Sequence, residues 1–288
     1  LQIKKQFGTY LSPAMVEKLQ KNPELLQLGG ESRELSIMFT DVRGFTSISE
    51  HYGADVQGLT KIMNRYMTAM TASILEENGT LDKYIGDAQM AFWNAPLDDK
   101  DHAKHAVSAA VKMLGKLKDF NDEIAKEGVP AFGMGLGINT ATVVVGNMGS
   151  SQRFDYTCLG DGVNLASRLE GQSKNYGVYI ILGPETAKQV KDSYHVVELD
   201  CIAVKGKKEG VNIFTIIDNA DWANSHVKTH ENFLKMYYSG DWDRARKYAK
   251  DLRVLFNGKL EHYYDMMLER MTDVPPKGFD GVYRATTK

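Results

Sequence analysis

Two aspartates are the first residues in this 288-residue sequence whose positions suggest shared chemistry. Asp41 follows a run of alternating apolar residues, and Asp87 lies in a Gly-Asp turn between two short apolar runs. If these runs are neighbouring strands, the two carboxylates can form a pair that suits Mg²⁺, which binds a few carboxylates together with substrate phosphate oxygens. An Asp at a strand end is usually an ordinary turn residue, so the pair alone is weak evidence for a metal site.

The turn after Asp41 offers a second kind of contact. Residues 42–46 include Gly44 and can direct backbone N–H groups toward a phosphate, which makes Phe45 and Thr46 candidate substrate-binding residues. With 35 Lys and Arg against 37 Asp and Glu residues, the chain is nearly neutral, so any phosphate binding must be local. The same balance argues against nucleic acid or an anionic membrane as the partner.

The segment 156–170, YTCLGDGVNLASRLE, contains the third candidate group. On a helix that starts near Asp161, Asn164 and Arg168 are four residues apart and share one face, while the apolar residues face the core. The amide and the guanidinium can then contact a ribose oxygen and a phosphoryl group, because Arg presents a rigid fork of donors. The structural alternative, an Arg that covers the sheet edge and an Asn bonded to backbone, is the more common arrangement without further context.

The periodicity of the sequence predicts the elements that would position these residues. Helices are expected over residues 56–70 and 102–124. Strands are expected at 35–39, 81–85, 88–93, 132–138, 142–146, 156–159 and 211–217. The order strand, helix, strand, strand, helix, strand is that of a ferredoxin-like α+β fold, whose mostly antiparallel central sheet carries flanking helices on one face and leaves the other face for a partner or ligand.

Three regions follow from changes in pattern along the chain. Residues 1–30 have helical spacing broken by prolines and read as a connecting arm, and residues 31–218 hold all the candidate motifs. Residues 219–288 are helical and aromatic and resemble a single tetratricopeptide-type repeat. One such repeat cannot bury its own apolar face, so we expect it to pack on the main domain or on a second copy of the chain.

The two cysteines and the lack of a long apolar run suggest the cellular setting. Cys158 and Cys201 have no Cys-x-x-Cys or Cys/His spacing, which argues against a disulfide framework and a structural zinc site. No apolar run approaches the ~20 residues that span a bilayer. These features predict a catalytic portion in the reducing cytoplasm.

Four motifs taken together resemble those of the class III nucleotidyl cyclases. They are FTDVRGFT at residues 39–46, KYIGD at 83–87, the segment 137–149, and the Tyr-Thr-x-x-Gly-Asp-x-Val-Asn-x-Ala-x-Arg-Leu-Glu pattern at 156–170. Their order and approximate spacing are those of the family, and the resemblance covers about residues 31–218. Four motifs in register are far more specific than any one of them.

The resemblance implies an adenylate cyclase of signal transduction, which converts ATP into 3′,5′-cyclic AMP and pyrophosphate. Asp41 and Asp87 would bind two divalent cations, Mg²⁺ or Mn²⁺, and Asn164 and Arg168 would stabilise the transition state. The implied chemistry is in-line attack of the ribose 3′-oxygen on the α-phosphorus. A guanylate cyclase and a catalytically inactive nucleotide-binding regulatory module are the alternatives, and an interaction protein would rest on the helical tail alone.

The resemblance also assigns residues to the base and the phosphates. Lys83 and Thr157 would recognise adenine, because an ammonium donates to ring N1 and a hydroxyl can accept from the 6-amino group. Guanylate-specific members carry an acid and a small thiol residue at these positions, so the pair favours ATP, and Cys158 lies one position away. Lys205 would bind the triphosphate, with a solvated hairpin charge as the less favoured alternative, and Arg153 is a further phosphate candidate.

In this family the metal carboxylates come from one subunit and the base, Asn, Arg and Lys residues from the other. The chain carries both sets, so the resemblance implies a head-to-tail homodimer with two equivalent sites. Similarity to bacterial members extends to residues 91–96 and 275–282, and in such proteins an upstream membrane-anchored sensor often precedes the cyclase. One departure is Ala141, where the family usually has glycine; at a positive φ the alanine would cost about 1 kcal/mol.

Overall fold

The computed structural model describes residues 2–25, 30–150, 154–203 and 207–284. The chain divides into two compact units, Leu1–Glu170 and Gly171–Lys288. Within the described residues, no helix is both long and apolar enough to cross a membrane. Each unit has its own strands and helices.

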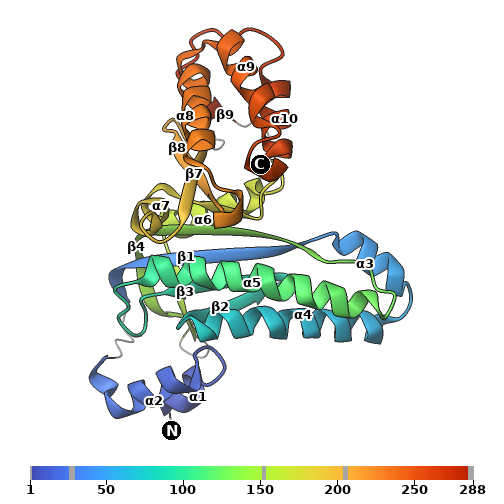
Figure 1. Ribbon diagram of the computed structural model, residues 1–288. Helices are drawn as coiled ribbons and strands as arrows, with labels where there is room; N and C mark the ends of the chain where they lie inside the picture. The colour runs from blue at the N-terminus through green and yellow to red at the C-terminus, as the bar shows by residue number, and fades with distance from the viewer. Residues whose placement is uncertain (1, 26–29, 151–153, 204–206, 285–288) are drawn as a thin grey trace. The chain divides into compact units, whose positions relative to one another are not determined.

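The first unit has the predicted α+β architecture (Figure 1). Its elements are α1 (Gln2–Phe7), α2 (Pro13–Lys21), η1 (Pro23–Leu25), β1 (Glu31–Arg43), α3 (Phe45–Tyr52), α4 (Val56–Glu76), β2 (Thr80–Ile85), β3 (Ala88–Trp93), α5 (His102–Ala125), β4 (Gly133–Gly149), β5 (Phe154–Leu159) and most of α6 (Asp161–Gln172). The strands are antiparallel in the order β2-β3-β1-β4, with β5 also paired to β4. This is the order of a ferredoxin-like sheet and confirms the expected fold class.

One face of this sheet is covered by α4 and α5, which lie side by side (Figure 1). Ser36 on β1 contacts His102 on α5, with 2.7 Å between Oγ and Nδ1. On β3, the Gln89 amide donates to the Thr71 hydroxyl of α4 over 2.9 Å, and the Trp93 indole donates to the Glu77 carbonyl. Ser36, Gln89 and Trp93 therefore find partners in the helical layer.

The opposite face is covered as well, which corrects the expectation that it is left free. On α1 and in the loop after it, Phe7 and Leu11 are buried in the same apolar cluster as Ile37 of β1 and Tyr156 of β5. The Phe7 and Tyr156 rings meet edge to face at 5.3 Å. The helical spacing of apolar residues in the expected connecting arm gives its helices an apolar face, and the sheet buries that face.

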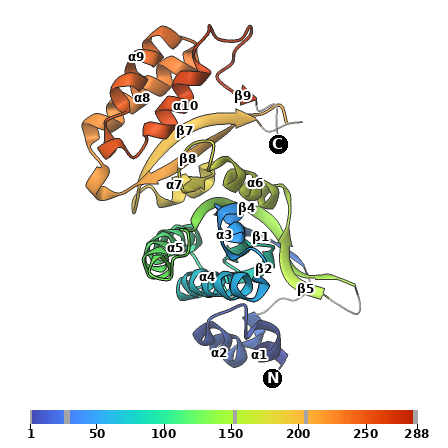
Figure 2. The ribbon, with the colours of Figure 1, turned by 90° about the vertical axis from the view of Figure 1, so that its right-hand side faces the viewer.

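Helix α6 covers the same face beside β4 (Figure 2). The approach is so close at Gly137 that an added Cβ would lie 2.3 Å from the Glu170 nitrogen and 2.6 Å from the Ala166 carbonyl oxygen. Only glycine permits this contact between strand and helix. Gly137, the first residue of the 137–149 motif, is thus required by the packing of α6 on β4.

Strand β4 runs unbroken over residues 133–149, so the prediction of two separate strands at 132–138 and 142–146 was wrong. Asn139, Thr140 and Ala141 are turn-like in composition but pair with β1. The Asn139 side chain donates to the Gly162 carbonyl of α6 over 3.0 Å, and the Thr140 hydroxyl lies 2.8 Å from that of Ser36. Tertiary hydrogen bonds therefore satisfy side chains that in isolation favour a turn.

Ala141 carries no backbone strain. Among the described residues it is absent from the non-glycine positions with positive φ, so the conditional cost of an alanine here does not arise. Its methyl group lies beside Gly162, where an added Cβ would come within 2.5 Å of the Ala141 Cβ. The lack of a side chain at Gly162 thus leaves room for the methyl group of Ala141.

The second unit combines four of the described strands with the helical tail (Figure 2). Its elements are β6 (Ile180–Leu182), α7 (Pro184–Val190), β7 (His195–Ala203), β8 (Val211–Ile217), η2 (Asn219–Asp221), α8 (Asn224–Ser239), α9 (Trp242–Leu252), η3 (Phe256–Gly258), α10 (Glu261–Arg270) and β9 (Tyr283–Arg284). The strand order is β6-β8-β7-β9, with β9 parallel to β7. Helices α8 and α9 form the predicted hairpin, and α10 is an additional helix that the sequence analysis did not separate.

The tail packs on β7 of its own chain through buried polar contacts. His230 of α8 is 2% exposed and lies 2.5 Å from the Glu198 carbonyl through Nε2 and 2.8 Å from the Tyr264 hydroxyl through Nδ1. Burial lowers the pKa of His230 to about 4, so the ring is neutral at pH 7, donating to the carbonyl and accepting from the tyrosine. The tail is thereby tied to the backbone of β7.

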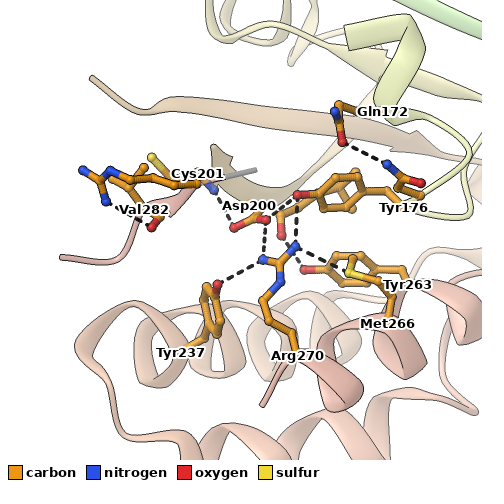
Figure 3. A network of polar contacts seen from close by, with 12 residues as sticks. Gln172, Tyr176, Asp200, Cys201, Tyr237, Tyr263, Met266, Arg270 and Val282 are labelled. Carbon is orange, nitrogen blue, oxygen red and sulfur yellow. Dashed lines mark hydrogen bonds and ion pairs between the residues drawn. The ribbon is translucent and has the colours of Figure 1, made fainter. Parts of the chain in front are cut away.

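A buried ion pair is the centre of this contact (Figure 3). The Arg270 guanidinium of α10 donates to the Asp200 carboxylate of β7 over 2.6 Å, and the Asp200 side chain is fully buried. The Tyr176 hydroxyl donates to the same carboxylate over 2.5 Å. Burial raises the pKa of Asp200, while Arg270 and Tyr176 act in the opposite direction. A charge in this position is tolerated only with its partners present.

Replacement of Arg270 should therefore destabilise the second unit. We expect Arg270→Ala to lower the free energy of unfolding by about 3–5 kcal/mol, because Asp200 is left buried and unpaired. Urea unfolding followed by tryptophan fluorescence, to which Trp222 and Trp242 of this unit and Trp93 of the first unit contribute, measures the change. Arg253→Ala is the matched control, since Arg253 forms its ion pairs at the surface; equal effects of the two variants would contradict the prediction.

Candidate active site

The two aspartates predicted as metal ligands are brought together by the pairing of β1 with β3. Thr40 of β1 is opposite Gln89 of β3, so Asp41 comes level with the turn that contains Asp87. The turn is tight because Gly86 adopts a φ of +64°, which glycine permits without strain. One carboxylate oxygen of Asp41 accepts a hydrogen bond from the backbone nitrogen of Val42 over 2.9 Å.

The electrostatics of this pair suit a cation. Burial raises the pKa of Asp87 to about 6, with further contributions from a hydrogen bond to Asp41 and from its negative charge. Two neighbouring carboxylates that repel each other in this way hold a proton between them or a cation in its place. Within the described residues no cluster has three or more His, Cys, Asp or Glu side chains arranged for a metal. Any further ligands would come from phosphate or water, as Mg²⁺ prefers.

Two groups behind the pair were not identified from the sequence. Burial raises the pKa of Glu170 to about 7, and the charge of Asp41 raises it further while Arg43 opposes the shift. Tyr66 of α4 is fully buried, and burial, Asp87 and Asp41 all raise its pKa. Glu170 is the last residue of the 156–170 motif, so the motif could have identified it. Nothing in the spacing of α4 distinguishes Tyr66 from its apolar neighbours.

Helix α3 begins beside Asp41, which forms the acid pair with Asp87. Gly44 precedes it in the left-handed region, with φ +80° and ψ 17°. Phe45 and Thr46 are exposed at its first turn, where backbone N–H groups have no partner within the helix. Such a helix start can accept a phosphate, as predicted for these two residues.

The predicted base-recognition residues lie together around a third side chain, Asp82. The Thr157 hydroxyl of β5 donates to one oxygen of Asp82 over 2.5 Å. The Lys83 ammonium lies 3.8 Å from the other oxygen. A register shift between Leu81 and Lys83 interrupts the pairing of β2 with β3 at this point. Asp82 precedes the KYIGD motif directly, yet its role depends on a contact with a residue 75 positions away.

Asp82 is an unusual carboxylate because its side chain is fully buried. Burial raises its pKa to about 6, against the hydrogen bond from Thr157 and the charge of Lys83. It is therefore ionised at neutral pH but at a cost in stability. Burial also raises the pKa of the neighbouring Cys158 thiol, whose side chain faces the core.

Asn164 and Arg168 share the exposed face of α6, while Val163, Ala166 and Leu169 are buried as predicted. In the part of the chain that the structure describes, neither exposed side chain has a hydrogen bond or ion pair. The two are thus available to a ligand or to another chain. Two further predicted phosphate contacts, Lys205 and Arg153, lie outside the described residues.

Comparison with known proteins points to one family. A family model described as the adenylate and guanylate cyclase catalytic domain matches residues 30–218. The chain is 34% identical over 204 residues to adenylate cyclase 1 of Rhizobium meliloti (strain 1021), covering 70% of this chain and 30% of that protein. It is 36% identical over 201 residues to adenylate cyclase of Anabaena cylindrica, covering 67% and 39%. The chain thus spans well under half the length of these relatives.

Two solved structures are similar to this chain. The adenylyl cyclase CyaB from P. aeruginosa shares 34% identity with a TM-score of 0.62, covering 67% of this chain and 97% of that one. The guanylyl cyclase Cya2 also shares 34% identity, with a TM-score of 0.59 and coverage of 66% and 94%. Identity to solved relatives does not by itself separate the two nucleotide specificities.

Removal of the buried charge at position 82 should stabilise the protein in a pH-dependent way. The pKa of Asp82 rises from 3.8 to about 6 on folding, so the ionised form costs up to about 3 kcal/mol above pH 6. We expect Asp82→Asn to raise the free energy of unfolding by up to that amount at pH 8. This gain in the free energy of unfolding should shrink as pH falls from 6 toward 4, because Asp82 of the native protein is then protonated in the folded state. Urea unfolding at pH 8 and pH 4.5 tests this, and a gain independent of pH would contradict it.

Proposed function

Because the chain belongs to the adenylate and guanylate cyclase catalytic domain family, we propose that it is an adenylate cyclase that converts ATP into 3′,5′-cyclic AMP and pyrophosphate. The observation that carries the choice of nucleotide is the pair Lys83 and Thr157, an ammonium and a hydroxyl grouped around Asp82. These groups match a ring nitrogen that accepts and an amino group that donates. Relatives named adenylate cyclase support the same substrate.

In the proposed reaction the ribose 3′-oxygen attacks the α-phosphorus in line. The new P–O bond closes the cyclic phosphate as the bond to the β-phosphate breaks and pyrophosphate leaves. When bound, two divalent cations, Mg²⁺ or Mn²⁺, neutralise phosphate charge and acidify the 3′-hydroxyl. Asp41 and Asp87 would hold them, since burial and then the neighbouring Asp41 raise the pKa of Asp87, and a bound cation can offset both effects.

The remaining residues of the site position the substrate. Backbone N–H groups at Phe45 and Thr46 would donate to phosphate oxygens at the start of α3. Arg168 would donate to the phosphoryl group in transit, and Asn164 would hold the ribose oxygen. No side-chain nucleophile is needed, because catalysis of this transfer is mainly positioning and charge stabilisation. We include Lys205 and Arg153 as triphosphate contacts.

We further propose that the active form is a head-to-tail homodimer, in which one subunit supplies the acid pair and the other supplies the base-binding residues, Asn164 and Arg168. The exposure of the last two supports this, because within the described residues nothing from their own chain engages them. One chain carrying both half-sites gives two equivalent sites about a two-fold axis.

A guanylate cyclase is the second candidate, favoured by the equal identity to a solved guanylyl cyclase. Cys158 does not strengthen this reading, because its thiol is buried in the core and Thr157 occupies the position next to Asp82. The nature of the product distinguishes the two activities directly.

Loss of one metal carboxylate should abolish turnover. Cyclic nucleotide formation is measured from ATP and separately from GTP with Mn²⁺, and Asp41→Ala is expected to lose at least about a hundred-fold in kcat. Asp119→Ala, which removes an exposed carboxylate of α5, should retain full activity. Cyclic GMP as the main product would establish the second candidate, and no product from either nucleotide at high protein concentration would favour an inactive binding module.

Two inactive variants should restore each other if the site is shared between subunits. When Asp41→Ala and Arg168→Ala chains are mixed, half of the dimers are mixed and each has one intact site, so about a quarter of the native activity is expected. Each variant alone should stay inactive at the same concentration. Failure of complementation, with mixed dimers demonstrated by differently tagged chains, would mean that one chain forms the whole site.

A further inference from the structure

We infer that Asp82 is a positioning residue that determines base specificity, because it fixes the direction of the Thr157 hydrogen bond. The inference rests on the proposed function and goes beyond it, since neither the sequence motifs nor the comparisons assign Asp82 a role. Asp82 itself need not touch the nucleotide. It acts through the two side chains that do.

The contact between Asp82 and Thr157 is short and enclosed. The Thr157 hydroxyl lies 2.5 Å from the Asp82 carboxylate, and both residues are buried, at 7% exposure each. They come from strands β2 and β5, and the register shift at position 82 aims the carboxylate toward β5. A charge-assisted hydrogen bond of this length is not readily exchanged for one to a ligand.

The direction of this bond determines what Thr157 can offer a base. An ionised carboxylate only accepts, so the single hydroxyl proton of Thr157 is committed to Asp82. The hydroxyl oxygen can then only accept from a ligand. The 6-amino group of adenine is a donor and fits, whereas the 6-oxygen of guanine is an acceptor and would face another acceptor in a desolvated site.

The second oxygen of Asp82 serves Lys83. Among the described residues it has no hydrogen-bond partner, and the Lys83 ammonium lies 3.8 Å away with its side chain 44% exposed. This is an electrostatic contact that holds the ammonium near the site without using up its donors. The charged groups around Asp82 are Lys83 and the exposed Asp155, with the uncharged Thr157 and Cys158 completing its surroundings.

An asparagine at position 82 would keep the shape and remove the constraint. Its amide can donate to the Thr157 oxygen, which releases the hydroxyl proton toward the 6-oxygen of guanine. Asp82→Asn should therefore reduce the ratio of kcat/KM for ATP to that for GTP by at least about ten-fold. Asp155→Asn removes a nearby exposed charge without touching Thr157 and should leave the ratio within about two-fold.

A double-mutant comparison tests whether Asp82 acts through Thr157. With Thr157→Ala as background, adding Asp82→Asn should not change the ATP to GTP ratio further, because no hydroxyl remains to be oriented. A ratio unchanged by Asp82→Asn in the native background would overturn the inference. So would a change of the same size in the Thr157→Ala background, which would assign the effect to Lys83 or to local structure.

The pH profile gives a readout that a merely structural role would not move. Because burial raises the pKa of Asp82 to about 6, the native ATP to GTP ratio should fall as pH drops below 6, where the protonated carboxyl can donate to Thr157. The ratio in Asp82→Asn should be flat over the same range. Both nucleotides carry the same triphosphate, so titration of the phosphates and of the metal site cancels in the ratio.

The inference can fail independently of the proposed activity. If the native protein forms no cyclic nucleotide, dissociation constants for ATP and GTP measured by isothermal titration calorimetry replace kcat/KM in the same set of variants. A native preference for ATP that Asp82→Asn removes supports the inference even without turnover. Equal preferences in the native protein and in Asp82→Asn refute it, whether or not the enzyme is active.

Discussion

The antiparallel pairing of β1 with β4 is the constraint on which the first unit depends. It runs without interruption from Glu31 opposite Val145 to Arg43 opposite Gly133. Because β1 is also paired in register with β3, with Thr40 opposite Gln89, Asp41 can occupy only one position relative to the β2–β3 turn, and a slip of one residue would turn its side chain to the other face. The same strand β4 receives α6 at Gly137, so the acid pair and the face with Asn164 and Arg168 are placed by one framework.

Local pattern was sufficient for the regular elements and for the motif residues. The helix expected over 102–124 is α5 almost to the residue, and the strands 81–85 and 88–93 are β2 and β3. The pattern failed where tertiary partners decide the outcome. Residues 139–141 form part of one strand because Asn139 and Thr140 find hydrogen bonds on α6 and β1. The sequence did not single out Asp82 for the same reason, since the role inferred for it depends on a contact with Thr157 far along the chain.

The helical tail illustrates how buried polar groups make an association specific. A hairpin of the repeat type usually presents one face to a neighbour, and here β7 of the same chain takes that place, through His230 and Arg270. A purely apolar contact would tolerate several arrangements, whereas an ion pair with a fully buried carboxylate tolerates only those in which every partner is present. An interaction surface inferred from the repeat pattern alone would therefore include side chains, such as His230 and Arg270, that already bond to β7.

The contact between Ala141 and Gly162 has a consequence for how this sequence can change over time. The two positions share one small volume, since a methyl group at 162 would come within 2.5 Å of the one at 141. With alanine at 141, a side chain at 162 forces the backbone to shift, whereas glycine at 141 would remove that contact. The order in which substitutions at these two positions become acceptable is thus constrained by geometry.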